Sequence, residues 1–139
     1  MSEHVTEAAG AFERTIQVEP ADIDQLGHAN NVTYLRWVQD IAVAHWTVTA
    51  SEEDQKKFLW IVLRHEIDYK QPAFLGDELI VRTWVGQATR LKFERHTEFS
   101  RGRDNRLVAK ALTVWCSVAP ATGRPIEVSP EVRAAFSTP

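Results

Sequence analysis

The feature that most constrains this chain is one uninterrupted helical pattern near its N-terminal end. Residues 31–49, NVTYLRWVQDIAVAHWTVT, contain no Gly or Pro. Their polar side chains recur at intervals of three, four and seven residues: Thr33, Arg36, Asp40 and Thr47. Apolar side chains cover most of the remaining circumference, which a surface helix would not need. Asn30 is a favoured N-cap type, so the sequence predicts a long helix that begins at residue 31 and is wrapped by a sheet.

The rest of the chain reads as strands. Alternating or β-branched patterns predict strands at 12–19, 58–69, 78–85 and 91–99. In the second of these, Ile61, Leu63, Ile67 and Tyr69 are expected on one face, and Arg64, Glu66 and Asp68 on the other. A nearly continuous apolar run at 107–118 predicts a strand buried on both faces. The connecting segments are a charged turn or short helix at 51–57, turns at 86–90, 101–105 and 122–125, and a short helix at 130–136.

This order of elements predicts an α+β fold with a curved antiparallel sheet of about five strands around one long central helix. A chain of 139 residues fits one domain, which we place at residues 12–136 after a flexible N-terminus at 1–11. Such a sheet leaves strand edges and apolar faces open, and a second copy commonly covers them. We therefore expect a homodimer or a homotetramer.

Charge and cysteine content exclude several classes of protein. The formal net charge of -3 argues against a general nucleic-acid binder, which needs an excess of Lys and Arg. The single Cys116 offers no internal disulfide and no Cys-based zinc site, and we expect it to be a core residue. No basic and apolar leader and no run of 18 apolar residues is present, so we expect a cytoplasmic protein without a membrane span.

Chemistry-bearing residues concentrate in VEPADIDQLGHANNVTYLRW, residues 18–37, directly before and at the start of the predicted helix. The first amides of a helix are unpaired and carry a partial positive charge, so they can bind a polarised carbonyl oxygen. A carboxylate a few residues upstream can face the same carbonyl. Two interpretations stay open on residue chemistry alone: Asp22, Asp24, Gly27 and Asn30 only shape the loop and cap the helix, or they form a catalytic site.

The spacing Asp24, Gly27-His28, Asn30-Asn31 and Tyr34-Leu35-Arg36-Trp37 resembles the signature of hot-dog fold acyl-CoA thioesterases of the 4-hydroxybenzoyl-CoA thioesterase type. EIDYKQPAFLGDELIVRTWV at 66–85, RLKFERHTEF at 90–99 and the C-terminal segment also resemble the later strands and tail of that family. The resemblance covers residues 12–136 and implies a hot-dog fold. It also implies hydrolysis of acyl-CoA, or of an acyl carrier thioester, to a free acid and thiol, with CoA as part of the substrate and no other cofactor.

The resemblance assigns roles to individual residues. Asp24 is implied as nucleophile or general base, with Asp22 as a supporting acid. The oxyanion contact falls on the backbone N–H of Asn31, and His28 is expected to polarise the carbonyl, bind water or hold the loop. Gly27 and Tyr34 are assigned to substrate binding, although Tyr34 matches a helix position that in the family mainly packs.

Basic residues between 90 and 103 are the candidates for binding the phosphates of CoA. Five of them, with Arg90 and Lys92 chosen as the binding pair, outnumber the acids of this window: Arg90, Lys92, Arg95, Arg101 and Arg103 against Glu94 and Glu98. The alternative interpretation is a solvated strand face, in which case Arg64, Lys70 or a second subunit would contact the coenzyme.

The remaining histidines do not suggest a metal site. His65 and His96 lack the spacing of a ligand set, and His45 is expected to be a satisfied core histidine. Two other functions stay open at this point: a hot-dog dehydratase or hydratase, which would use a His and acid pair, and an acyl-CoA binding module without turnover. An acid placed before the helix, rather than inside it, favours hydrolysis.

Overall fold

The computed structural model describes residues 11–136. Its strands are β1 (Phe12–Gln17), β2 (Leu59–Tyr69), β3 (Glu78–Ala88), β4 (Lys92–Arg101) and β5 (Leu107–Val118). Its helices are α1 (Asn31–Thr49), α2 (Glu52–Lys57) and α3 (Pro130–Phe136), with a short 3-10 helix η1 (Pro20–Asp22). The five strands form one antiparallel sheet in the order β1-β3-β4-β5-β2. The expectation of a flexible segment at 1–11 lies almost wholly outside the described residues.

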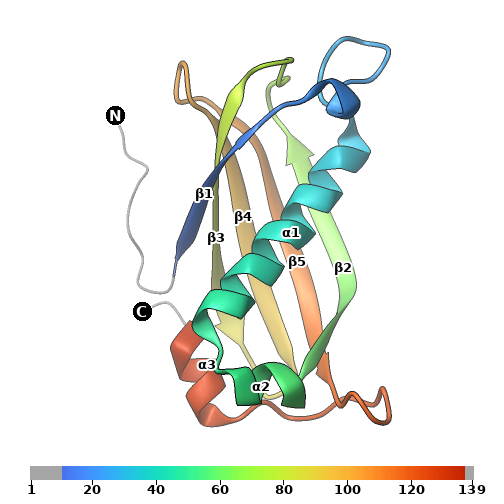
Figure 1. Ribbon diagram of the computed structural model, residues 1–139, viewed down its shortest axis with the longest axis vertical. Helices are drawn as coiled ribbons and strands as arrows, with labels where there is room; N and C mark the ends of the chain where they lie inside the picture. Colours follow the sequence, from blue (N-terminus) through green and yellow to red (C-terminus); the bar gives the residue numbers. More distant parts are fainter. Residues whose placement is uncertain (1–10, 137–139) are drawn as a thin grey trace.

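Helix α1 lies across one face of the curved sheet and connects its two edges, β1 and β2 (Figure 1). It begins where the sequence predicts, because the side chain of Asn30 accepts a hydrogen bond from the N–H of Val32 at 2.9 Å. Helix α2 follows with Ser51 as its N-cap, three acids in its first turn and two lysines in its last turn, which complements the helix dipole. The predicted α+β architecture is confirmed.

The inner face of the sheet holds two apolar clusters separated by polar residues. The helix-start cluster includes Tyr34, Trp37, Leu79 and Phe99, and the helix-end cluster includes Phe58, Val85, Phe93 and Phe136. Between them runs a row of inward-facing polar side chains, the polar belt: Thr83, Arg95, Thr97, Thr113 and His65. Hydrogen bonds join its members, from Arg95 to Thr83 at 3.1 Å and between His65 and Thr113 at 3.0 Å.

The predicted assignment of side chains to the two faces of β2 is wrong, because the strand contains a β-bulge. The register with β5 shifts between Val62 and Arg64, so Ile61 shares a face with Arg64 rather than with Ile67. The extra residue of a bulge reverses the alternation that follows it, which a strict period of two does not anticipate. Trp60, rather than Ile61, therefore points inward with Ile67.

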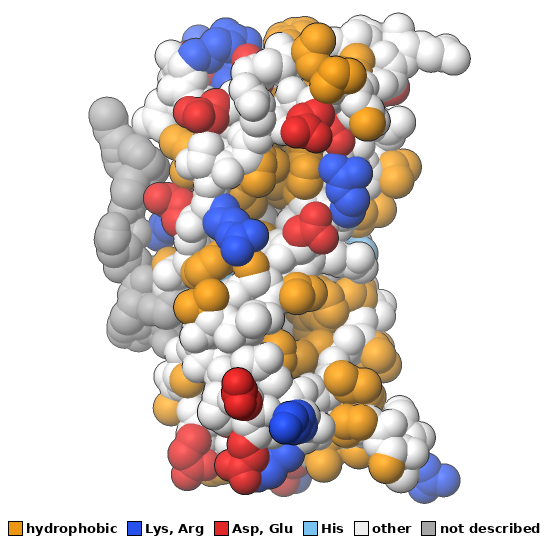
Figure 2. Space-filling model, viewed as in Figure 1, with side chains coloured by type: hydrophobic (Ala, Val, Ile, Leu, Met, Phe, Trp, Pro, Cys, Tyr) orange, Lys and Arg blue, Asp and Glu red, His pale blue; other side chains and the backbone are white. Residues whose placement is uncertain are grey.

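Burial differs from the sequence patterns in two details. The sheet covers one side of α1, and Val32, Val43 and Val48 are exposed. Strand β5 is buried or half-buried along its length except at Lys110, which is exposed. Figure 2 shows hydrophobic side chains gathered along the edge of the molecule formed by β2, where Leu59, Ile61 and Leu63 are about half exposed. The structure thus keeps one strand edge and one helix face open together.

Candidate functional site at the start of helix α1

The segment between η1 and α1 is closed on itself by backbone hydrogen bonds. Ile23 and Ala29 form an isolated antiparallel bridge. The N–H of Asp24 donates to the carbonyl of His28 at 3.1 Å, and the N–H of Gly27 donates to the carbonyl of Asp24 at 3.0 Å. Gly27 has φ of 84°, in the left-handed region that favours glycine. Residues 23–29 therefore form a miniature hairpin that leads directly to the helix.

Asp24 is held in this hairpin with one carboxylate oxygen engaged. Its Oδ1 accepts from the N–H of Leu26 at 2.9 Å. Its Oδ2 accepts no hydrogen bond from any residue between 11 and 136. The side chain is half-buried. The turn thus fixes the carboxylate while one oxygen remains available to a substrate or a water molecule.

Asp22 has a different environment, with both carboxylate oxygens occupied. Its Oδ1 pairs with Arg36 on α1 and its Oδ2 accepts from the N–H of Glu19, each at 2.9 Å. Its side chain is 5% exposed, and its backbone carbonyl accepts from the N–H of Asn30 at 2.8 Å. These contacts tie the loop to the helix, which makes Asp22 a positioning residue.

The start of α1 presents a backbone amide without an acceptor. The N–H groups of Val32 and Thr33 donate to the side chain and the carbonyl of Asn30. Within residues 11–136 the N–H of Asn31 donates to nothing, and the residue is exposed. The helix dipole adds partial positive charge at this end. The structure thus brings Asp24, Gly27, His28 and Asn31 together at one loop-helix junction.

The backbone of His28, and not its imidazole ring, forms the hydrogen bond that closes the loop. Its backbone carbonyl makes the hairpin bond, whereas its ring nitrogens form no hydrogen bond with the described part of the chain. The half-buried ring meets Phe74 edge-on, with centroids 6.5 Å apart. Phe74, Leu75 and Leu26 are all exposed, so the junction has an apolar rim.

Tyr34 lies beneath the junction rather than at its surface. Its side chain is 2% exposed and meets the rings of Trp37, Tyr69 and Phe99 edge-on at 5.1 to 5.4 Å. Burial, with a further contribution from Tyr69, raises its pKa to about 12. Tyr34 is therefore a packing residue in the described chain, consistent with its helix position in the family that the sequence resembles.

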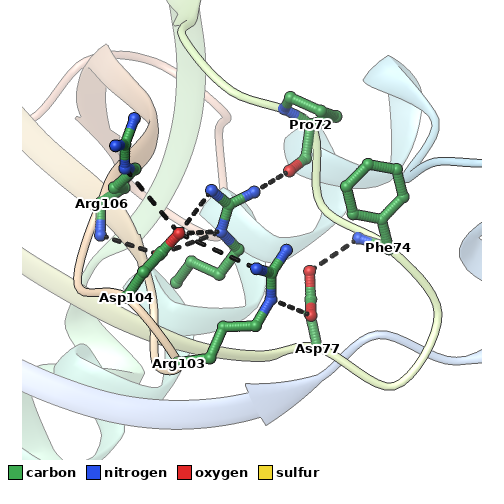
Figure 3. Close-up of polar contacts among 7 residues, drawn as sticks. Pro72, Phe74, Asp77, Arg103, Asp104 and Arg106 are labelled. Carbon is green, nitrogen blue, oxygen red and sulfur yellow. Dashed lines mark hydrogen bonds and ion pairs between the residues drawn. The ribbon is translucent and has the colours of Figure 1, made fainter.

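An arginine cluster anchors the loop beside the junction (Figure 3). Arg101 pairs with both carboxylate oxygens of Asp104 and donates to the carbonyl of Pro72 at 2.8 Å. Asp77 accepts from Arg103 at 3.1 Å and from the N–H of Phe74 at 2.9 Å. The hydrogen bonds from Arg101 lower the pKa of Asp104 to about 2. This cluster holds residues 72–77 in place, and the N–H of Ala29 in turn donates to the carbonyl of Ala73 at 2.8 Å.

The basic window at 90–103 does not form one patch. Strand β4 has 10 residues, so at about 3.3 Å per residue it separates its two ends by about 30 Å. Arg90 and Lys92 are exposed at the end away from the junction, and Arg101 lies beside it. Within one protomer, Arg90 and Lys92 are thus remote from Asp24. Arg95 is 4% exposed on the inner face, which contradicts its expected place on a surface patch.

Comparison with known proteins identifies the family. A model of the thioesterase-like superfamily matches residues 18–136. The chain belongs to the thioesterase-like superfamily. No curated protein sequence matches this superfamily member at a significant level.

Solved structures share the hot-dog fold of this superfamily member. A 1,4-dihydroxy-2-naphthoyl-CoA thioesterase from Synechocystis aligns with a TM-score of 0.78 at 23% identity, over 91% of this chain and 95% of the other. A probable thioesterase from Escherichia coli aligns at 0.75 and 22% identity, over 88% and 94%. A 12:0-ACP thioesterase from Umbellularia californica aligns at 0.77 and 16% identity, over 91% of this chain and 50% of the other. These likenesses confirm the predicted fold.

The sequence did not anticipate one feature of this thioesterase-like protein, a cavity between α1 and the sheet. Arg95 and two tryptophans, Trp60 and Trp115, line a cavity under α1. The inward orientation of Arg95 could have been predicted from the alternating series Phe93, Arg95, Thr97 and Phe99. The apolar residues two and four positions away mark its face of β4 as the inner one.

None of the helices within residues 11–136 is both long and apolar enough to cross a membrane.

Proposed function

We propose that the protein hydrolyses acyl thioesters of CoA, with the acid placed at the start of α1 as the reacting group. The proposal rests on the geometry of the loop-helix junction. Asp24 has one free carboxylate oxygen on a loop fixed by its own backbone, and that loop runs directly into the unpaired N–H of Asn31. The thioesterase names of structures with the same fold support this reaction class.

The chemistry has two routes that use the same parts. In the first, Oδ2 of Asp24 bonds to the thioester carbonyl carbon, the carbon–sulfur bond breaks, and the thiolate takes a proton from solvent. Water then cleaves the resulting mixed anhydride. In the second, Asp24 takes a proton from a water molecule whose oxygen bonds to the carbonyl carbon, the same carbon–sulfur bond breaks, and the thiolate leaves with the proton that Asp24 returns. Both routes end with a free acid and CoA.

Each route develops negative charge on the carbonyl oxygen, which the start of α1 is suited to stabilise. A preorganised donor such as the N–H of Asn31 is worth about 3 to 4 kcal/mol of activation free energy in acyl transfer. The partial positive charge of the helix end acts in the same direction. The ring of His28 adjoins the same loop and can donate to the carbonyl or hold the water.

The phosphates of CoA need cations, but Arg101 and Arg103 beside the junction are paired with Asp104 and Asp77, and Arg90 and Lys92 lie at the far end of β4. We therefore propose that Arg90 and Lys92 reach the coenzyme from a second subunit. The open edge of β2, with its exposed Leu59, Ile61 and Leu63, supplies a surface on which a second copy can pair its own β2 and extend the sheet. The active assembly is then a homodimer, or a homotetramer built from such dimers.

Asp24→Asn tests the proposal, because an amide keeps Oδ1 for the N–H of Leu26 but supplies neither nucleophile nor base. We expect kcat for acyl-CoA hydrolysis, followed by free thiol release, to fall about a thousandfold at unchanged thermal stability. The matched control is Asp40→Asn, an exposed carboxylate further along α1. Turnover within a few-fold of the parent, with substrate still bound, would remove Asp24 from the catalytic role.

A further inference from the structure

A second site lies inside the protein, between the later part of α1 and the inner face of the sheet. It is a cavity of about 50 Å³. Its lining is mostly aromatic: Ala42, Val43, Trp46, Trp60, Phe93, Arg95 and Trp115. A water molecule needs about 10 to 15 Å³ of such volume, so the cavity has room for a group of a few heavy atoms. Val43 is 59% exposed and marks the side from which a longer molecule would enter.

Arg95 brings a positive charge into this cavity without a counterion. Its side chain is 4% exposed, and no carboxylate among residues 11–136 pairs with it. Burial lowers its pKa to about 10, so the guanidinium remains charged at neutral pH. A buried charge without a partner is costly, because it loses its hydration and gains no compensating attraction.

The hydrogen bonds of Arg95 leave one edge of the guanidinium free. Its Nη1 contacts Nδ1 of His45 at 2.9 Å and Oγ1 of Thr83 at 3.1 Å. Burial and the nearby Arg95 lower the pKa of His45 to about 4, so the imidazole is neutral and accepts this bond. Nε and Nη2 of Arg95 donate to no residue of the described chain. These two groups form the edge with which arginine binds a carboxylate through two parallel hydrogen bonds.

Two further donors beside the cavity lack acceptors, although they lie beneath its surface. The indole Nε1 atoms of Trp60 and Trp115 are buried and have no hydrogen-bond partner within residues 11–136. Buried indole N–H groups usually find a partner, and leaving one unpaired costs about 1 to 3 kcal/mol. Arg95 is therefore the one charged residue of the aromatic lining, and the two indole N–H groups lie behind that lining.

We propose that this cavity is a binding site for a carboxylate group carried on an apolar stem. The planar carboxylate fits the free edge of Arg95, while the rings of Trp46 and Phe93 surround the stem. The inference goes beyond the hydrolysis proposed above. Asn31 and Ala42 are eleven positions apart on α1, about 16 Å at 1.5 Å per residue, so the cavity lies away from the reacting carbonyl of the same chain.

The carboxylate has two possible sources that the experiment separates. It can be the far end of an acyl group whose thioester is bound at a junction, or it can belong to a free carboxylic acid. Both use the same chemistry at Arg95. The first source makes the cavity a determinant of acyl specificity, and the second makes it a separate ligand site.

Tryptophan fluorescence gives a direct readout, because Trp46, Trp60 and Trp115 line the cavity. The parent protein is titrated with sodium propionate and with propionamide, its neutral counterpart of the same shape, at constant ionic strength. We expect the carboxylate to bind at least tenfold more tightly than the amide. Val43→Phe narrows the entrance and should weaken propionate binding at least tenfold. Val48→Phe, at a position that is also exposed on the same helix but lies outside the cavity, should leave propionate binding unchanged.

A variant of Arg95 addresses the donor directly. Arg95→Met should abolish the preference for carboxylate over amide. If Arg95→Met fails to fold, Val43→Phe, which leaves Arg95 in place, decides the matter. Equal response to propionate and propionamide, or a propionate affinity that Val43→Phe does not change, would show a cavity that holds water only and overturn the proposal.

An experiment on the Asp24→Asn protein, which retains the cavity, then decides between the two sources of the carboxylate. An acyl-CoA that ends in a carboxylate is compared with its methyl ester in the same fluorescence assay. Tighter binding of the acid, lost in the Val43→Phe background, assigns the site to the acyl group. Equal binding of the two thioesters, with propionate still preferred over propionamide, assigns it to a free acid. The titrations do not depend on turnover, so failure of the proposed hydrolysis would leave their outcome intact.

Discussion

Replacing Gly27 with alanine separates the conformational role of the loop from general stability. Gly27 and Gly123 both have positive φ, at 84° and 69°, and an added Cβ would meet no atom within 4 Å at either position. The cost of alanine is therefore conformational, about 1 to 2 kcal/mol for a left-handed residue. The reduced freedom of the unfolded chain offsets about 0.4 to 1 kcal/mol of this. Each variant should lose roughly 1 kcal/mol of unfolding free energy, or roughly 4 °C in Tm.

Activity should distinguish the two variants. If the alanine of Gly27→Ala relieves its strain by leaving the left-handed region, the hairpin that holds Asp24 opens, and about 1 kcal/mol reduces the productive population roughly fivefold. We expect kcat/KM for acyl-CoA to fall by that factor in Gly27→Ala and to stay unchanged in Gly123→Ala. Thermal unfolding by circular dichroism and a thiol-release assay measure both quantities. Full activity in a Gly27→Ala protein that is as destabilised as Gly123→Ala would refute the link between this turn and Asp24.

Three further predictions follow from charge, assembly and burial. Arg90→Ala with Lys92→Ala should raise KM for acyl-CoA at low salt with little change in kcat, and should leave a pantetheine thioester unaffected; equal KM values for acyl-CoA would count against this contact. Sedimentation should find a homodimer or larger, and Ile61→Lys on the β2 edge should shift it toward monomer, whereas a folded, active parent monomer at micromolar concentration would contradict the proposed assembly. Because the pKa of His45 is about 4 in the fold and about 6.5 in the unfolded chain, the unfolded chain binds more protons between these values. Stability should therefore decrease by up to about 3 kcal/mol as pH falls from 6.5 to 4, and His45→Gln, which can still accept from Arg95, should flatten that dependence in denaturant titrations.

The sequence predicts the long helix and the strand order well because the signals are local. The N-cap side chain of Asn30 fixes the start of α1 at the predicted residue, and the absence of Gly and Pro lets the helix continue to Thr49. The faces of β2 are predicted poorly because the bulge near Leu63 comes from pairing with β5, which no local pattern records.

The same distinction between local signals and tertiary contacts applies to the residues of the candidate site. Asp24, Gly27, His28 and Asn31 are close in sequence, so their assembly into one junction follows from chain proximity and a turn. The distance of Arg90 and Lys92 from Asp24 is a consequence of strand direction, and the burial of Arg95 depends on which face the helix covers. These are tertiary facts that counting charges in a window does not anticipate.

The polar belt also limits how the sheet can assemble incorrectly. A slip of one residue in β4 would place Glu94 and His96 against α1 and turn Arg95 and Thr97 to the outer face. Apolar clusters alone tolerate exchange of one hydrophobic residue for another, but the threonine hydroxyls of the belt and Nη1 of Arg95 find their partners in a single alignment of strands. The belt thus selects the native partner positions during folding, and the same residues that make the interior polar exclude misaligned sheets.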